Sequence, residues 1–221
     1  MMSSLNPDET IDDLDSYKII QRKNGYRFST DAVLLADFIL PLKSTDSVID
    51  LGTGSGVIPL ILAQKSSVQK IVGIEIQEGL ADIAERNVKL NNLCSRIDII
   101  KGDFRTLGTD LKSVPTTKLG KGVFSVVVSN PPYWKPGTER ISPCSEKAKA
   151  KMELTCDLAE IVKISRYLAA EKARIIYVYA VYRLKEMLSA ITANKLVIRR
   201  FQFVQPKAGC VAKRFLIEVG V

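Results

Sequence analysis

Short apolar segments typical of β-strands alternate with segments of helical periodicity through most of the 221-residue chain. Residues 123–129 are strongly β-branched, as in a strand, whereas apolar side chains recur near helical spacing in residues 78–91. Such alternation indicates a mostly parallel sheet with helices on both faces. The other expected strands are residues 47–51, 70–76, 96–101 and 173–179, and the other expected helices are residues 31–39, 57–64, 154–170 and 182–194. Residues 196–205 and 211–219 are expected to close the sheet as an antiparallel pair, which gives seven strands.

The chain is expected to form one domain. Residues 1–16 hold five acidic side chains and no basic one, and we expect them to be a flexible acidic tail. Residues 17–221 are then the folded domain, in which residues 17–45 form an N-terminal hairpin and a helix that caps the sheet. In the hairpin, residues 17–21 are expected to pair with residues 26–28 around a turn at Asn24-Gly25. No apolar stretch approaches the roughly 18 residues of a membrane span, and the N-terminus lacks signal-peptide features. We therefore expect a cytoplasmic protein with no membrane partner.

Composition narrows the chemistry. The chain has no histidine, which excludes Ser-His-Asp catalysis and His-ligated zinc. Its four cysteines show no CxxC spacing, so no metal site is expected. The net charge is +8, and it is +13 over residues 17–221, because the first 16 residues hold five of the 24 acids and none of the 32 bases. A basic body of this kind favours a polyanionic partner such as RNA or DNA.

A glycine-rich segment follows the first expected parallel strand. Asp50 lies near the end of the strand, and Gly52, Gly54 and Gly56 alternate through the turn, with Thr53 after the first glycine. Glycines permit a tight turn in which a ligand approaches the bare backbone. The segment is not a Walker loop, since no Gly-Lys-Ser/Thr follows, and its third glycine comes one residue early for a G-x-G-x-x-G motif. We expect these five residues to bind a ligand at the carboxyl end of the strand, as in other parallel sheets.

Acidic residues end or follow the next two strands. Glu75, followed by Ile76, lies about 20 residues beyond the glycine loop, where a carboxylate can accept hydrogen bonds from a ribose diol. Asp103 can accept from an adenine amino group, and Phe104 can pack on the adenine ring. The ordered set resembles the S-adenosylmethionine site of class I methyltransferases, with a dinucleotide site or a plain tight turn as alternatives. The resemblance implies a Rossmann-like fold and S-adenosyl-L-methionine as cofactor, bound by these residues.

The sequence Asn130-Pro-Pro-Tyr133 follows the expected strand 123–129. It resembles the motif of amino-methyltransferases that act on adenine N6, guanine N2 or glutamine N5. An exocyclic amine is a poor nucleophile because its lone pair is delocalised into the ring. The Asn130 side-chain oxygen and the Pro131 carbonyl can accept its two hydrogens, which would favour the pyramidal nitrogen of the transition state. Tyr133 would stack on the base. We therefore expect Asn130, Pro131 and Tyr133 to be catalytic, with Asn130 also next to the cofactor.

Four further segments of the sequence resemble one particular methyltransferase family. Residues 25–36, 130–137, 150–154 and 205–218 resemble the bacterial tRNA1(Val) adenine-N6-methyltransferase family, which modifies the adenine just 3′ of the anticodon. The resemblance implies tRNA as partner and adenine 37 as target. Residues in the first of these stretches, Arg27, Ser29 and Asp31, are expected to close over the methionine end of the cofactor. One departure is Lys151-Met152, which stands where the family usually has Arg-His.

Two basic zones, residues 135–151 and 183–214, are expected to contact the RNA, and the second carries eight bases against one acid. Trp134 could stack a neighbouring base. The expected RNA contacts are Trp134, Lys135, Arg140, Lys147, Lys151, Arg199, Arg200, Lys207, Lys213 and Arg214. A monomer is the expected state.

Three alternatives use the same motifs. The first is a protein glutamine-N5 methyltransferase, although such relatives typically add an N-terminal helical domain, for which we see no room before residue 17. The second is an rRNA guanine-N2 methyltransferase, which the basic charge does not separate from a tRNA enzyme. The third is an inactive RNA-binding module, against which the intact glycine loop and Asn130 argue.

Overall fold

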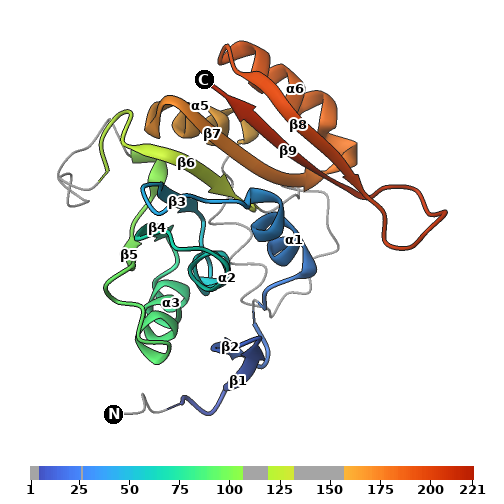
Figure 1. Cartoon of the computed structure of the whole chain (residues 1–221). Helices are drawn as coiled ribbons and strands as arrows, with labels where there is room; N and C mark the ends of the chain where they lie inside the picture. Colours follow the sequence, from blue (N-terminus) through green and yellow to red (C-terminus); the bar gives the residue numbers. More distant parts are fainter. Residues whose placement is uncertain (1–4, 26, 107–118, 132–156) are drawn as a thin grey trace.

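The computed structural model describes residues 5–25, 27–106, 119–131 and 157–221. Seven strands form one twisted sheet in the order β5-β4-β3-β6-β7-β9-β8 (Figure 1). Their bounds are β3 (Ser47–Leu51), β4 (Lys70–Glu75), β5 (Ile97–Lys101), β6 (Phe124–Ser129), β7 (Ala169–Ala180), β8 (Val197–Val204) and β9 (Arg214–Gly220). The pairs from β5 through β7 are parallel, whereas β9 is antiparallel to both β7 and β8. The predicted fold class, with its closing antiparallel pair, is confirmed.

Helices cover both faces of the sheet. One core lies between the sheet and the helices α1 (Thr30–Ile39), α2 (Val57–Lys65) and α3 (Glu78–Leu90). A second core lies between the opposite face and the helices α5 (Leu158–Leu168) and α6 (Leu184–Ala193). Short 3-10 turns, η1 (Phe104–Thr106) and η2 (Val181–Arg183), follow β5 and β7. The central strand β6 is buried on both faces, which explains its continuous run of valines. Among the described residues, no helix is long and apolar enough to cross a membrane.

The expected helix over residues 154–170 begins and ends differently in the structure. It begins at Leu158, because Asp157 forms a capping box with Glu160. It ends at Leu168, and Ala169 opens the long strand β7, whose expected start was residue 173. Helix formation therefore stops where β7 pairs with β6 and takes over the backbone hydrogen bonds.

The N-terminal region differs most from the sequence prediction. Residues Glu9–Leu14, expected in a flexible tail, form strand β1, which pairs antiparallel with β2 (Tyr17–Arg22). The hairpin thus turns at residues 15–16, and the expected pairing of β2 with residues 26–28 is wrong for Arg27 and Phe28, which lie in no strand. The buried Glu9 carboxylate binds the Arg86 guanidinium of α3 at 2.7 Å, which anchors β1 on the domain.

Candidate active site

The carboxyl ends of β3, β4, β5 and β6 meet at one edge of the sheet. Leu51, at the end of β3, pairs with Ile74 of β4 on one side and with Ser129 of β6 on the other. The Ser129 hydroxyl also donates to the Leu51 carbonyl at 2.7 Å. The glycine loop and Asn130 therefore leave adjacent strands side by side, as expected for ligand-binding residues in a parallel sheet.

The conformation of the glycine loop is fixed by the φ angles of its glycines and by backbone hydrogen bonds to β4. Gly52, Gly54 and Gly56 all have positive φ, at 77°, 58° and 83°. The amides of Gly52 and Thr53 both donate to the Ile74 carbonyl, at 2.9 and 3.0 Å, which ties the loop to β4. A side-chain carbon added at Gly52 would meet no atom within 4 Å, so open space lies over this part of the backbone. The loop thus leaves room for a ligand against bare backbone.

Glu75 lies beneath the loop and is almost fully buried. Its two carboxylate oxygens accept from the Gly54 and Gln77 amides at 2.8 and 2.9 Å. Burial raises the pKa of the Glu75 carboxyl, and the hydrogen bonds from backbone amides, those of Gln77 and Gly54 first, oppose this rise. Each oxygen keeps a further lone pair, so the carboxylate can still accept from two hydroxyl groups of a ligand.

Asp50 is fully buried at the end of β3, and neither of its carboxyl oxygens has a hydrogen-bond partner among the described residues. Burial raises the pKa of Asp50 to about 7; the neighbouring Glu75 carboxylate adds to this rise, and the nearby Thr53 hydroxyl opposes it. A buried carboxyl group without a partner is costly. Its acceptor capacity next to the glycine loop fits a cationic or hydrogen-bond-donating ligand group.

The end of β5 brings Asp103 to the same edge. Both carboxylate oxygens of Asp103 accept from the Arg105 Nε, each at 2.8 Å. Partial burial raises the pKa of Asp103, but the Arg105 hydrogen bonds outweigh it and the pKa is lowered overall. The Phe104 ring is 6% exposed and packs in the core with α5, so its place in this structure is a core position. Ile76 is half-buried beside Glu75.

Asn130 follows β6 and is half-buried, and Pro131 is buried behind it. The third expected catalytic residue, Tyr133, lies outside the described residues. The site therefore combines an open glycine backbone, buried acids and the first half of the Asn-Pro-Pro-Tyr motif.

Comparison with known proteins identifies the family. A protein of Porphyromonas gingivalis, named tRNA1(Val) (adenine(37)-N6)-methyltransferase, is 30% identical over 212 residues, which cover 93% of this chain and 80% of that protein. One of the same name from Erwinia tasmaniensis is 31% identical over 160 residues, covering 66% and 61% of the two chains. The chain belongs to the tRNA1(Val) (adenine(37)-N6)-methyltransferase family. Residues 31–130 also match the family model described as ribosomal protein L11 methyltransferase (PrmA).

Solved structures support the fold of this family member. A predicted O-methyltransferase of Agrobacterium tumefaciens superposes with a TM-score of 0.65 at 17% identity, covering 86% of this chain and 80% of that one. TYW2 of Pyrococcus horikoshii, in complex with MeSAdo, superposes with a TM-score of 0.67 at 14% identity, covering 97% and 72%. The family indicated by the sequence motifs and the Rossmann-like methyltransferase fold are confirmed.

Two of the three N-terminal site candidates of this family member contact strands β1 and β9. The Arg27 guanidinium donates to Asp12 of β1 at 2.8 Å and to the Thr10 hydroxyl at 3.2 Å. Ser29 is the exposed N-cap residue of α1, and Asp31 in the first helical turn forms an ion pair with Arg214 at 3.0 Å. The described contacts thus tie Arg27 to β1 and Asp31 to β9, and the predicted role of all three residues at the cofactor stays a prediction.

The expected RNA contacts divide into two groups. Trp134, Lys135, Arg140, Lys147 and Lys151 lie outside the described residues. The others lie on or beside β8 and β9. Arg200 binds the buried Glu218 carboxylate at 2.7 Å and stacks on the Phe38 ring, and Arg214 pairs with Asp31. Lys207, Lys213 and Arg199 are exposed.

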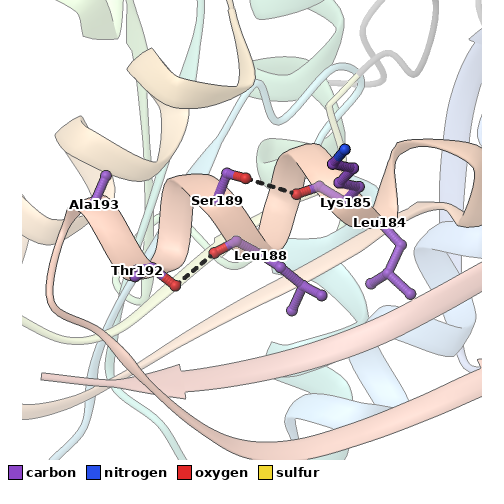
Figure 2. A pocket seen from close by; sticks show the side chains of 6 residues that line it. All are labelled: Leu184, Lys185, Leu188, Ser189, Thr192 and Ala193. Atoms are coloured by element: carbon purple, nitrogen blue, oxygen red, sulfur yellow. Dashed lines mark hydrogen bonds between the residues drawn. The ribbon is translucent and has the colours of Figure 1, made fainter.

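A shallow hollow on the outer face of α6 is separate from this site (Figure 2). Its lining residues are Leu184, Lys185, Leu188, Ser189, Thr192 and Ala193. Leu184 and Leu188 point to one side of the helix, and Lys185 and Ser189 to the other. Both hydroxyl groups donate to backbone carbonyls within α6. With one ionisable group and no group able to activate an amine, the hollow offers no catalytic chemistry. Among the described residues, no cluster of three or more histidine, cysteine or acidic side chains could hold a metal ion.

Sequence reasoning missed Asn87, a fully buried residue of α3. Its side chain accepts from the Ile20 amide at 2.6 Å and donates to the Ile20 carbonyl at 3.1 Å and to the Ser55 carbonyl at 2.9 Å. It therefore joins β2 to the glycine loop. The signal was present, because an asparagine between the apolar Ala84 and Val88 on the inner face of a helix requires buried partners.

Proposed function

We propose that this chain transfers a methyl group from S-adenosyl-L-methionine to N6 of adenine 37 in tRNA1(Val). The observation that carries the proposal is the position of Asn130 directly after β6, the strand that pairs with β3 where the glycine loop begins, in a chain of this family. The relatives named above act on this adenine according to their names. A tRNA substrate in turn places the enzyme in the cytoplasm.

The residues of the loop fit the cofactor. The space over Gly52 accepts a ligand against the backbone, and Glu75 keeps acceptor capacity for the ribose hydroxyls. Asp50 has two buried oxygens to offer to the cationic end of the ligand. Thr53, Gly54, Gly56, Ile76 and Asp103 complete the proposed cofactor set. When bound, the cofactor supplies an electrophilic methyl group on a sulfonium.

The catalytic work of the chain is to orient and polarise the amine. The Asn130 side-chain oxygen and the Pro131 carbonyl accept the two hydrogens of the adenine amino group, and Tyr133 stacks on the base. Fixed acceptors of this kind favour the pyramidal nitrogen without a reorganisation cost in the transition state. Alignment of the nitrogen with the methyl group supplies the rest of the rate. No strong base is needed, which agrees with a chain that has no histidine.

The test is a methylation assay with labelled S-adenosylmethionine, in which total tRNA, rRNA and a release factor are offered in parallel. We expect N6-methyladenosine in tRNA. Label in protein or as N2-methylguanosine would contradict the proposed substrate.

The Asn130→Ala variant tests the mechanism. Its turnover should fall by about 100-fold or more, as when one group of a preorganised polar site is removed. Its affinity for S-adenosylmethionine, measured by calorimetry, should stay within a few-fold of the parent. Unchanged turnover would contradict the role of Asn130.

A further inference from the structure

The edge of the sheet that carries Asn130 continues across three more strands. β7 lies next to β6, with Ser129 paired to Tyr177, and it runs three residues further to Ala180 before η2 begins. β8 runs in the same direction as β7, because both are antiparallel to β9. The ends of β6, β7 and β8 and the loop 205–213 therefore all lie at this edge, from which the loop projects (Figure 1).

Two exposed rings lie along this edge. Tyr182 of η2 is 64% exposed and Phe203 of β8 is 51% exposed, which makes them the most exposed aromatic side chains among the described residues. The Phe203 ring meets Phe201 edge-on, with ring centres 4.9 Å apart, and Phe201 stacks on the buried Phe215 at 5.5 Å. Phe203 is thus a supported ring with an open side. Flat, exposed rings of this kind suit stacking by an unpaired base.

The charge around these rings is of one sign. Residues 195–214 contain six lysine or arginine residues and no acidic residue. Arg200 and Arg214 are bound to acids of the fold, whereas Lys207 and Lys213 are exposed on the loop between the two strands. The backbone carbonyl of Lys213 accepts a hydrogen bond from the amide of Val181, the residue before Tyr182, so this lysine and the Tyr182 ring belong to neighbouring segments. This combination is complementary to a polyanion and argues against an apolar protein partner.

We propose that the tRNA strand beside the target adenine follows this edge, with bases stacked on Tyr182 and Phe203 and phosphates bound by Lys207 and Lys213. The inference rests on the proposed function and adds the direction in which the RNA leaves the site. We call this path of the RNA, along Tyr182, Phe203, Lys207 and Lys213, the track. From β6 to β8 the track crosses three strand spacings, roughly 15 Å in all. Tyr182 lies one strand from Asn130 and holds the base nearest the target; Phe203 holds one further along.

The stacking residues are tested by the binding of fluorescently labelled tRNA to the full chain. Tyr182→Ala and Phe203→Ala should each weaken binding by about tenfold, the loss expected for one stacked base. Tyr182→Phe keeps the ring and should bind as the parent does. In turnover assays the alanine variants should raise KM for tRNA, with kcat at saturating tRNA and the Kd for S-adenosylmethionine unchanged. A structural defect would not separate these quantities in this way.

The phosphate contacts are tested by salt dependence. Lys207→Gln and Lys213→Gln should each lower the slope of log Kd against log salt concentration by roughly 0.7 to 1, the loss of about one phosphate contact. The control is Lys195→Gln, because Lys195 is also exposed but lies before β8, at the opposite edge of the sheet. Its slope should equal that of the parent.

The outcomes separate this inference from the proposed function. If the parent methylates tRNA but the ring and lysine variants bind and react as the parent does, the track is wrong and the function stands. If the variants instead change the sedimentation of the free protein without affecting tRNA binding, the patch is an interface between copies, which also overturns the track. If the parent forms no N6-methyladenosine yet the variants lose tRNA affinity as predicted, the function fails and the track stands.

Discussion

The two halves of the carboxyl edge of the sheet are built in opposite ways. At β3 and β4 the backbone of the glycine loop is fixed by hydrogen bonds to Ile74 and Glu75, and the acids Asp50 and Glu75 are buried beneath it. At β8 and β9 the edge presents exposed basic side chains and rings, such as Lys207 on the projecting loop and Phe203 near the end of β8 (Figure 1). The first half is shaped to enclose a small ligand, and the second is shaped to lie against a large anion.

The difference shows what each kind of binding requires. A small cofactor is recognised through a few backbone and carboxylate groups at fixed positions, so a short motif encodes the site. An RNA surface needs charge and flat rings spread over tens of residues, and only the topology brings them to one edge. Substitutions in the first half should therefore impair cofactor binding, whereas those in the second should leave cofactor binding unchanged.

Two glycines give the largest and most direct contrast. Gly52 in the cofactor loop and Gly209 in the β8–β9 loop have φ of 77° and 79°, and an added side-chain carbon would meet nothing within 4 Å at either position. Leucine should thus cost a similar backbone strain at both, about 1–2 kcal/mol of stability. Only Gly52→Leu should also lower kcat/KM for S-adenosylmethionine, by about 100-fold or more, because its side chain displaces the ligand. Thermal melts and steady-state kinetics check both effects; equal kinetic losses in the two variants would place the cofactor elsewhere.

Two asparagines of the α3 region bind strand β2. Asn87 lies within α3 and binds β2 in the core, whereas Asn91, the C-cap residue of α3, binds β2 near the surface. Asn87→Ala leaves the Ile20 amide and two carbonyls without partners in a buried place, and should cost about 3 kcal/mol of unfolding free energy. Asn91→Ala loses two bonds to Lys18 that water can replace, and should cost about 1 kcal/mol or less.

Urea unfolding measures both values. Asn87→Ala should also weaken S-adenosylmethionine binding, since Asn87 holds Ser55 of the glycine loop. Equal losses of unfolding free energy in the two variants would contradict the prediction that the buried contacts of Asn87 hold the hairpin on the domain.

The buried acid Asp50 predicts an unusual pH dependence of stability. Its pKa is raised from 3.8 to about 7, so the folded state holds a proton that the unfolded state releases. Its contribution to stability is present below pH 3.8 and is lost as pH rises towards and through 7. Asp50→Asn should therefore stabilise the ligand-free protein at pH 8, by on the order of 2–3 kcal/mol, and leave it unchanged near pH 3.5. Thermal melts across this range check the prediction; a constant difference would contradict it.

Glu9 supplies the opposite control. Its pKa is lowered from 4.5 to about 2, chiefly by the hydrogen bonds from Arg86. The stability that it contributes is present above pH 4.5 and is lost as pH falls through 2. Glu9→Gln should thus be destabilised at neutral pH, with a difference that narrows in acid, the reverse of the Asp50 variant.

The sequence predicted most of the sheet because its strands are short apolar runs bounded by motifs. Strand Ser47–Leu51 was predicted to the residue, and the positions of the glycine loop, Glu75 and Asn130 at one edge followed from the alternation of strands and helices. The N-terminal strand β1 could not be predicted in this way. Its acidic residues resemble those of a solvated tail, since Arg86, which binds Glu9, lies 77 residues away in the sequence. The exposure of the Tyr182 ring could not be predicted from the sequence either, because it depends on which helix covers the end of β7.

Arg27 gives the smallest expected effect and tests the remaining disagreement between motif and structure. The sequence resemblance places it at the methionine end of the cofactor, whereas its described contacts are with Asp12 and Thr10 of β1. Both partners in the ion pair are more than a third exposed, so Arg27→Ala should change stability by less than about 0.5 kcal/mol. If the pair with Asp12 is its only role, its Kd for S-adenosylmethionine should stay within twofold, as should that of Asp12→Asn. A loss of cofactor affinity in Arg27→Ala alone would instead show that Arg27 leaves β1 and closes over the ligand, because Asp12→Asn breaks the same ion pair while keeping the guanidinium.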